Sequence, residues 1–225
     1  MKIRLIFIVV LGIFVSNVSA QNCGGFFLKE KGKQITYQHF NNKNKLESIS
    51  ILTLKEIATT STKVEYHFET RLQDSKGKDN GTFNYSSWCE GDNYFIDMSK
   101  FMGSTDFSAM GEISIETDNL SFPSKLSVGE TLKDASLKIV LSGPISLSIN
   151  NVITDRKVEA QETVVTPVGE FKCYKISSKS TSENMGMKIV MKSIEWYSEN
   201  LGCIKSETYN SNGELESSQI VSAIK

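Results

Sequence analysis

The stretch TKVEYHFETRL, from Thr62 to Leu72, alternates apolar and polar side chains at every second position. A period of two is the signature of a β-strand with one buried face and one wet face. Weaker alternation and short apolar runs recur on both sides, over Ile49–Thr53, Phe83–Tyr85, Tyr94–Ile96, Glu112–Thr117, Ser136–Leu141, Ile145–Ile153, Lys157–Val165, Phe171–Ser178, Met185–Trp196, Cys203–Tyr209 and Leu215–Val221. Turn-forming residues separate these segments, so the sequence predicts roughly ten to twelve strands in an antiparallel meander.

A long antiparallel sheet with one apolar face twists and must cover that face. We therefore expect an all-β fold: a large curved antiparallel meander sheet, shaped as an open half-barrel, with one or two short helices as cover. The helices are predicted at Met98–Met102, where Asp97 can cap the first turn, and at Phe107–Met110. Only three prolines and no Ser/Gly/Pro-rich tract interrupt the chain, which predicts a single β domain over residues 21–225.

The first twenty residues have the pattern of a signal peptide. Lys2 and Arg4 precede an apolar run, Leu5–Val15, and Val18-Ser19-Ala20 supplies the small residues that favour cleavage after Ala20. The run is about half of the ~20 residues that span a bilayer, so we expect no transmembrane anchor after cleavage. The protein is predicted to be exported, to the periplasm, the outer-membrane surface or the extracellular space.

All four cysteines, Cys23, Cys89, Cys173 and Cys203, lie beyond the predicted cleavage site. An even number of cysteines in an oxidising compartment favours disulfides, with three possible pairings. Cys173 and Cys203 begin neighbouring segments of the meander, so we predict that they pair and that Cys23 pairs with Cys89. Lipidation of Cys23 is the alternative, although the preceding Ala20-Gln21-Asn22 fits a lipoprotein signal poorly.

The sequence contains no recognisable catalytic or metal-binding constellation. Its two histidines, His39 and His67, are not part of a local nucleophile or metal motif, and we predict no catalytic residue, no metal and no cofactor. The net charge of −1 becomes more negative when Lys2 and Arg4 are removed, which argues against a nucleic-acid partner.

One strand is unusually rich in methionine. Met185, Met187, Ile189 and Met191 share a face of the segment that ends near Trp196. Methionine is flexible and polarisable, which suits a surface that adapts to an apolar ligand, but it also fills gaps in irregular cores. The same segment adds Trp196, and the predicted helical cover adds Met98, Phe101 and Met102. Together these eight residues form the candidate ligand-binding set.

Several segments, taken in order, resemble the TapB-like family of exported bacterial proteins. The resemblance is carried by Tyr94–Met98, Phe122-Pro123, Val128–Ala135, Arg156–Val158, Thr163–Ile176, Ile194–Tyr197, Leu201–Tyr209 and Asn212–Leu215. That family has no established catalytic residues, and it is similar in predicted architecture to lipoprotein carriers of the LolA and LolB type. The resemblance implies a curved antiparallel sheet forming an open half-barrel around an apolar cavity.

These observations lead to three functional hypotheses. The first is an exported non-enzymatic binding protein that holds an apolar or lipid-like ligand on the concave face of the sheet. The second is a structural or adhesion module that meets a cell-surface or envelope protein, and the third is an esterase-like hydrolase. An interior void of several hundred Å³ would favour the first hypothesis, and close packing would favour the second.

Overall fold

The protein is described by a computed structural model covering residues 25–99, 112–143, 147–184 and 186–225. Thirteen strands make up its regular secondary structure in these ranges, and the predicted all-β fold is confirmed. The strands are β1 (Gln34–Asn41), β2 (Leu46–Thr59), β3 (Lys63–Asp74), β4 (Asp79–Glu90), β5 (Asn93–Ile96), β6 (Glu112–Asp118), β7 (Leu120–Pro123), β8 (Ala135–Ser142), β9 (Leu147–Thr166), β10 (Gly169–Asn184), β11 (Met187–Ser198), β12 (Gly202–Tyr209) and β13 (Leu215–Ile224).

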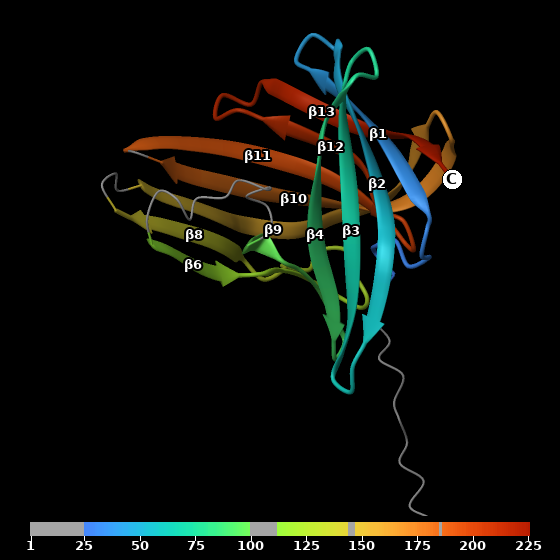
Figure 1. The fold of residues 1–225 in the computed structure, drawn as a ribbon. Helices are drawn as coiled ribbons and strands as arrows, with labels where there is room; N and C mark the ends of the chain where they lie inside the picture. Colours follow the sequence, from blue (N-terminus) through green and yellow to red (C-terminus); the bar gives the residue numbers. More distant parts are fainter. Residues whose placement is uncertain (1–24, 100–111, 144–146, 185) are drawn as a thin grey trace, which may run out of the picture.

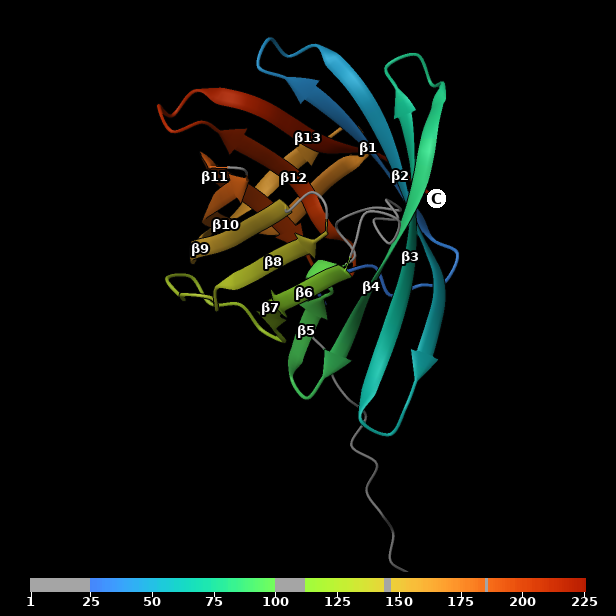
Figure 2. The same cartoon turned by 60° about the vertical axis from the view of Figure 1, so that its left-hand side comes forward.

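All thirteen strands belong to one antiparallel sheet, in the order β6-β8-β9-β10-β11-β12-β13-β1-β2-β3-β4-β5-β7. The sheet curls so strongly that β2, β3 and β4 cross β8–β11 at a steep angle (Figures 1 and 2). Because β1 pairs with both β2 and β13, the first and last strands of the chain lie next to each other. The sheet is therefore a nearly closed barrel with its core between the crossing halves.

The two edge strands of the sheet are neighbours in the sequence. β6 ends at Asp118 and β7 begins at Leu120, so only Asn119 separates the two ends of the ladder. The Asn119 side-chain oxygen accepts a hydrogen bond from the Met98 backbone N–H at 3.0 Å. The two edge strands are therefore linked through the backbone at Asn119, although no β-ladder joins them.

Most of the predicted helical cover lies outside the described residues, which include Asp97, Met98 and Ser99 but not residues 100–111. Asp97 accepts hydrogen bonds from the backbone N–H and the hydroxyl of Ser99, at 3.0 and 2.6 Å. The predicted signal peptide is likewise outside the described part. The described residues contain no helix that is long and apolar enough to cross a membrane.

β9 is one long strand where the sequence predicts two. Its ladder with β10 is interrupted by a bulge at Asp155, which has a left-handed φ of 54°. An extra residue at a bulge reverses which side chains face each side of the sheet. Ile153 faces the interior before the bulge, and Arg156 and Val158 face it afterwards, so the break in alternation marks a change of phase within one strand.

Arg156 links the third strand of the sheet to the opposite edge. Its side chain is 2% exposed, and its guanidinium donates to the backbone carbonyls of Ser121 on β7 and Lys133 just before β8. The same group lies 4.9 Å from the centre of the Phe122 ring. Arg156 therefore joins β9 to β7 and the start of β8 across the opening of the barrel.

Glu195 and Tyr197 favour the charged state of the buried Arg156 guanidinium. Burial raises the pKa of Glu195, while Arg156 and a hydrogen bond from the Tyr197 hydroxyl act in the opposite direction. Burial lowers the pKa of Arg156, and Tyr197 and Glu195 oppose that shift. This cluster keeps a cation inside the apolar core because its donors and its charge are both matched.

We expect Arg156→Ala to reduce the free energy of unfolding by about 3–5 kcal/mol, because two backbone carbonyls lose their donor and the Glu195 carboxylate loses a nearby positive charge. Urea denaturation measures this change. Arg71→Ala is the matched control, since Arg71 lies exposed on β3, and it should change stability by less than about 0.5 kcal/mol. Equal losses in the two variants would show that Arg156 does not hold the barrel closed.

Candidate functional site

The inner face of the sheet contains a small cavity. Its volume is about 120 Å³, and aromatic and aliphatic side chains line it: Phe26, Phe27, Leu28, Tyr37, Leu52, Phe68, Tyr85, Tyr94, Ile96, Phe122, Tyr197 and Leu201, with Gly202 and Cys203. Ligand sites for molecules of drug size usually measure about 300–1,000 Å³. The cavity is therefore too small for a lipid-like molecule with the surrounding residues in place.

The segment Phe26–Leu28 fills much of the interior. All three side chains are at most 5% exposed, and the Phe27 ring stacks on Tyr94 with centroids 3.9 Å apart. Phe27 also meets Tyr66 edge to face at 4.8 Å, and Phe26 meets Tyr174 at 5.5 Å. This short segment precedes β1 and occupies the space that an open half-barrel would offer to a ligand.

The inner face continues as a floor over β6, β8, β9, β10 and β11. Strand pairing sets one row of side chains as Ile115, Ile139, Ile149, Asn184 and Met187, and the next as Thr117, Leu137, Asn151, Ser182 and Ile189. We call these two rows the inner floor. Its β8 residues are buried, because Leu137 and Ile139 cluster with Met98.

The two ends of the inner floor are exposed to solvent. Ile115 on β6 is 45% exposed, and Met187 and Ile189 on β11 are 65% and 56% exposed. Large apolar side chains that remain exposed on a concave surface are typical of ligand or partner sites. Between these ends, β10 supplies polar groups, and the Ser180 hydroxyl donates to Asn151 at 3.0 Å in the adjacent row.

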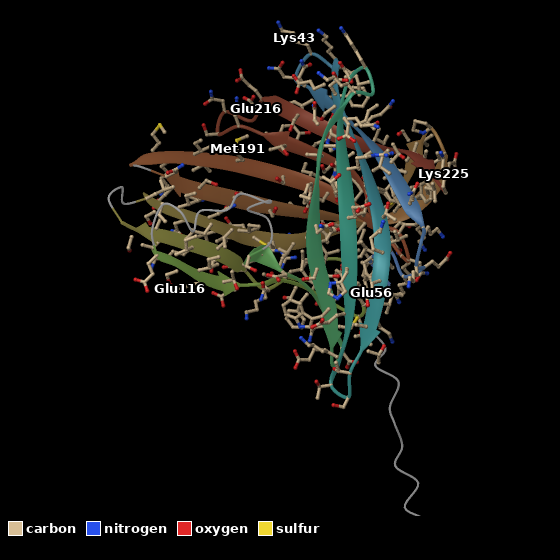
Figure 3. The ribbon with its side chains drawn as sticks, in the orientation of Figure 1. Lys43, Glu56, Glu116, Met191, Glu216 and Lys225 are labelled. Atoms are coloured by element: carbon tan, nitrogen blue, oxygen red, sulfur yellow. The ribbon has the colours of Figure 1, made fainter. Side chains whose placement is uncertain are left out.

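The structure brings together only part of the predicted ligand-binding set. Met187, Ile189 and Met191 share the inner face of β11, where Figure 3 labels Met191, and Met98 packs on the β8 part of the floor. Trp196 lies on the opposite face, because its offset along the strand from each of these three is an odd number of positions: five, seven and nine. Phe101, Met102 and Met185 lie outside the described residues.

Trp196 is held by polar groups on the outer face. Its indole N–H donates to Glu162 at 2.6 Å, and the ammonium groups of Lys175 and Lys205 lie 5.4 and 4.5 Å from its ring centre. The side chain is 5% exposed. Trp196 is therefore a packed residue of the outer surface, not a lining residue of the inner floor.

The described residues contain one pairing of an imidazole with a hydroxyl. His39 Nε2 lies 2.8 Å from the Ser50 hydroxyl, and burial lowers the pKa of His39. A nucleophile of this kind needs a third group that orients the base. The hydrogen bonds of the described residues include no carboxylate on His39, and His67 lies half-exposed beside Glu65 on β3. Within those residues, no group of His, Cys, Asp and Glu is arranged to hold a metal.

The predicted Cys173–Cys203 disulfide is wrong, because both residues are free cysteines. Cys173 pairs with Ser198 and Cys203 with Tyr197, so β11 lies between them and their side chains point to opposite faces. Two strand spacings are about 9.6 Å, whereas a disulfide needs Cα atoms within about 7 Å. Cys89 is buried on β4, and its predicted partner Cys23 lies outside the described residues, so that bridge stays a prediction.

The sequence profile of the DUF3108-like family matches residues 30–221. A Bacteroides fragilis crystal structure, of a protein inferred to be exported and with a YmcC-like fold, has a TM-score of 0.71 and 24% identity, covering 90% of this chain and 100% of that one. An inferred lipoprotein from Parabacteroides distasonis has a TM-score of 0.73 and 20% identity, covering 90% of this chain and 99% of that one.

At these identities the likeness shows a shared fold. No curated protein matches the chain. The profile match does not confirm the TapB-like name.

The cysteines give a direct test of connectivity. Burial raises the pKa of Cys173 to about 11 and raises that of Cys203 still further, so neither thiol should react readily in the folded protein at pH 8. In denaturant without reductant, we expect a thiol reagent to count two groups per chain, and four after reduction. Four groups before reduction would exclude a Cys23–Cys89 bridge, and none would contradict the free state of Cys173 and Cys203.

Proposed function

The chain belongs to the DUF3108-like family, and from this premise we propose that it is an exported, non-enzymatic protein that binds an apolar or lipid-like ligand on its inner face. The observation that carries the proposal is the exposure of Met187, Ile189 and Ile115 at the two ends of the inner floor. Burying one such side chain against a ligand is worth roughly 1.5–3 kcal/mol. The protein therefore has a physical reason to bind an apolar surface there.

The composition of the inner floor favours an elongated apolar ligand. Aliphatic side chains of β6, β8 and β9 lie on one side, and the methionine-bearing face of β11 lies on the other. Ser180, Ser182 and Asn184 of β10 run between them. Methionine adapts to ligands of different shape, so this surface suits a class of apolar chains rather than one rigid molecule.

Export is supported by two independent observations. The first twenty residues have the charge, apolar run and small residues of a signal peptide. The Bacteroides fragilis and Parabacteroides distasonis proteins that share this fold are inferred to be an exported protein and a lipoprotein. We propose that the chain works outside the cytoplasm, in the periplasm, on the outer-membrane surface or in the medium.

A second function, a structural or adhesion module of the cell surface, is favoured by a different observation. The half of the barrel around β1–β5 is closely packed, because Phe26–Leu28 fill it and leave only about 120 Å³. A protein whose interior is filled by its own chain needs no ligand there to be stable. In this case a cell-surface or envelope protein would cover the exposed residues of the inner floor.

The binding function is tested with N-phenyl-1-naphthylamine, a neutral probe whose fluorescence rises in apolar surroundings. We expect the protein to bind the probe and the double variant Met187→Ser/Ile189→Ser to bind it at least about tenfold more weakly, since two apolar contacts are removed. Val165→Ser is the matched control, because Val165 is 68% exposed near the β9–β10 turn, away from the inner floor. No binding by the parent protein, or an equal loss in the control, would contradict the proposal.

The adhesion function is tested on intact cells with a membrane-impermeant amine label, since 21 lysines lie beyond the predicted signal peptide. Adhesion predicts labelling of the protein before the envelope is opened. Labelling only after permeabilisation would place the protein in the periplasm and contradict this second function. The inner-floor proposal is compatible with either location and depends on probe binding alone.

A further inference from the structure

A groove lies on the outer face of the sheet, on the opposite side from the inner floor. Its volume is about 400 Å³, and its lining residues come from β9, β10, β11, β12 and the β12–β13 turn: Asp155, Ser177, Ser178, Lys179, Lys192, Ser193, Ile194, Tyr209 and Gly213. These strands lie side by side in both views of the ribbon (Figures 1 and 2). We call this the outer groove.

Two lysines face each other directly in the outer groove. Lys179 on β10 and Lys192 on β11 are cross-strand partners, and Tyr209 on β12 is the next residue of the same row. Like charges in directly opposite positions destabilise a sheet. In the described part of the chain, neither lysine forms an ion pair with a carboxylate, so an anion placed between them would relieve a repulsion that the protein itself leaves uncompensated.

The carboxylates of the next row are already engaged. Glu159 lies 3.4 Å from the Lys157 ammonium and accepts a hydrogen bond from Ser177 at 2.7 Å. Glu207 lies 2.7 Å from Lys205 and accepts a hydrogen bond from the Tyr209 hydroxyl at 2.6 Å. Asp155 is the one acidic residue among those that line the outer groove, against two lysines, so the lining carries a net positive charge.

The floor beside the lysine pair is apolar. Ile194 is half-buried in the row next to Lys192, and Tyr209, the β12 partner of Lys192, is its diagonal neighbour. The Tyr209 hydroxyl is turned to Glu207, which leaves the ring as the surface of the groove. The outer groove therefore has a positive end next to an apolar end. Its volume of about 400 Å³ is typical of small-molecule sites.

We propose that the outer groove binds an amphiphilic organic anion, with a carboxylate or phosphate head between Lys179 and Lys192 and an apolar tail on Ile194 and Tyr209. The two lysines select the anionic head, because their ammonium groups form charge-assisted hydrogen bonds with carboxylate or phosphate oxygens. The apolar floor selects the tail. This site is separate from the inner floor and does not depend on the proposed function.

The proposal is tested by calorimetric titration of the whole protein with sodium laurate below its micelle concentration. We expect laurate to bind, and the double variant Lys179→Gln/Lys192→Gln to bind it at least tenfold more weakly. Lys188→Gln is the matched control, since Lys188 is also exposed on β11 but is paired with Glu183 at 3.3 Å, and it should bind within twofold of the parent protein. Equal binding by the parent protein and the double variant would overturn the proposal.

Three further ligands separate the head from the tail. Dodecyltrimethylammonium has a similar tail and the opposite charge, and it should bind at least tenfold more weakly than laurate. Inorganic phosphate and acetate have the head alone and should bind more weakly still. Dodecyltrimethylammonium binding as tight as laurate binding would overturn the role of the lysines, and acetate binding as tight as laurate binding would overturn the role of the apolar floor.

Thermal melting of the double variant shows whether it is folded, and it also tests the repulsion between the two lysines independently of ligand binding. Removing a like-charge pair should leave the melting temperature of Lys179→Gln/Lys192→Gln equal to or above that of the parent protein at low salt. Adding salt screens the repulsion, so it should reduce the difference in melting temperature between the variant and the parent protein. A variant that melts lower at low salt would contradict the uncompensated repulsion on which the proposal rests.

The two sites are distinguished by crossing their variants and probes. Laurate binding should survive Met187→Ser/Ile189→Ser, and N-phenyl-1-naphthylamine binding should survive Lys179→Gln/Lys192→Gln. Loss of laurate binding in the first variant would place the anion on the inner floor and overturn the outer groove. If the parent protein does not bind N-phenyl-1-naphthylamine, while its laurate binding still depends on Lys179 and Lys192, the inner-floor function is refuted and the outer groove stays supported.

Discussion

A guanidinium in the middle of an apolar interior holds the two ends of this sheet together. Arg156 is buried, donates to carbonyls of β7 and of the segment before β8, and lies against the Phe122 ring. A thirteen-stranded antiparallel sheet that twists this strongly would otherwise open at its edges, because β6 and β7 are not hydrogen-bonded to each other. The orientation of Arg156 depends in turn on the bulge at Asp155, which turns its side chain from the outer face to the inner one. One left-handed residue thus determines whether the sheet can form a barrel.

The alternation of apolar and polar residues predicted most of this architecture. Thr62–Leu72 forms β3 almost as predicted, since its two faces meet very different surroundings. β7 is only four residues long and ends in Pro123, so it has too few positions to show a period of two. The cysteine pairing failed because consecutive segments of a meander are not always adjacent to each other in the sheet: β11 separates Cys173 from Cys203. Phe26–Leu28 was missed as an interior segment, although three successive large apolar residues outside any alternating run were a usable signal.

The candidate sites divide between the two faces of the same few strands. β10 and β11 present Met187 and Ile189 to the inner side and Lys179 and Lys192 to the outer side, since successive residues of a strand point in opposite directions. The methionines could be predicted as one face of one strand from spacing alone. The outer groove could not, because Lys179 and Lys192 become neighbours only when the register of β10 with β11 is known. Trp196 follows the same rule, and its even position separates it from the methionines that are close to it in the sequence.

Because β1 pairs with β13, the first strand cannot complete its hydrogen bonds until β13 has been made. Phe26 packs on Tyr174, and β1 completes its ladder with β13, more than 170 residues later in the sequence. Contacts between residues so far apart in sequence slow folding, because a long loop must close before they yield any stabilisation. A nascent chain that still lacks β13 has no complete barrel to adopt. Acquisition of the native state is therefore postponed until β13 is available to pair with β1.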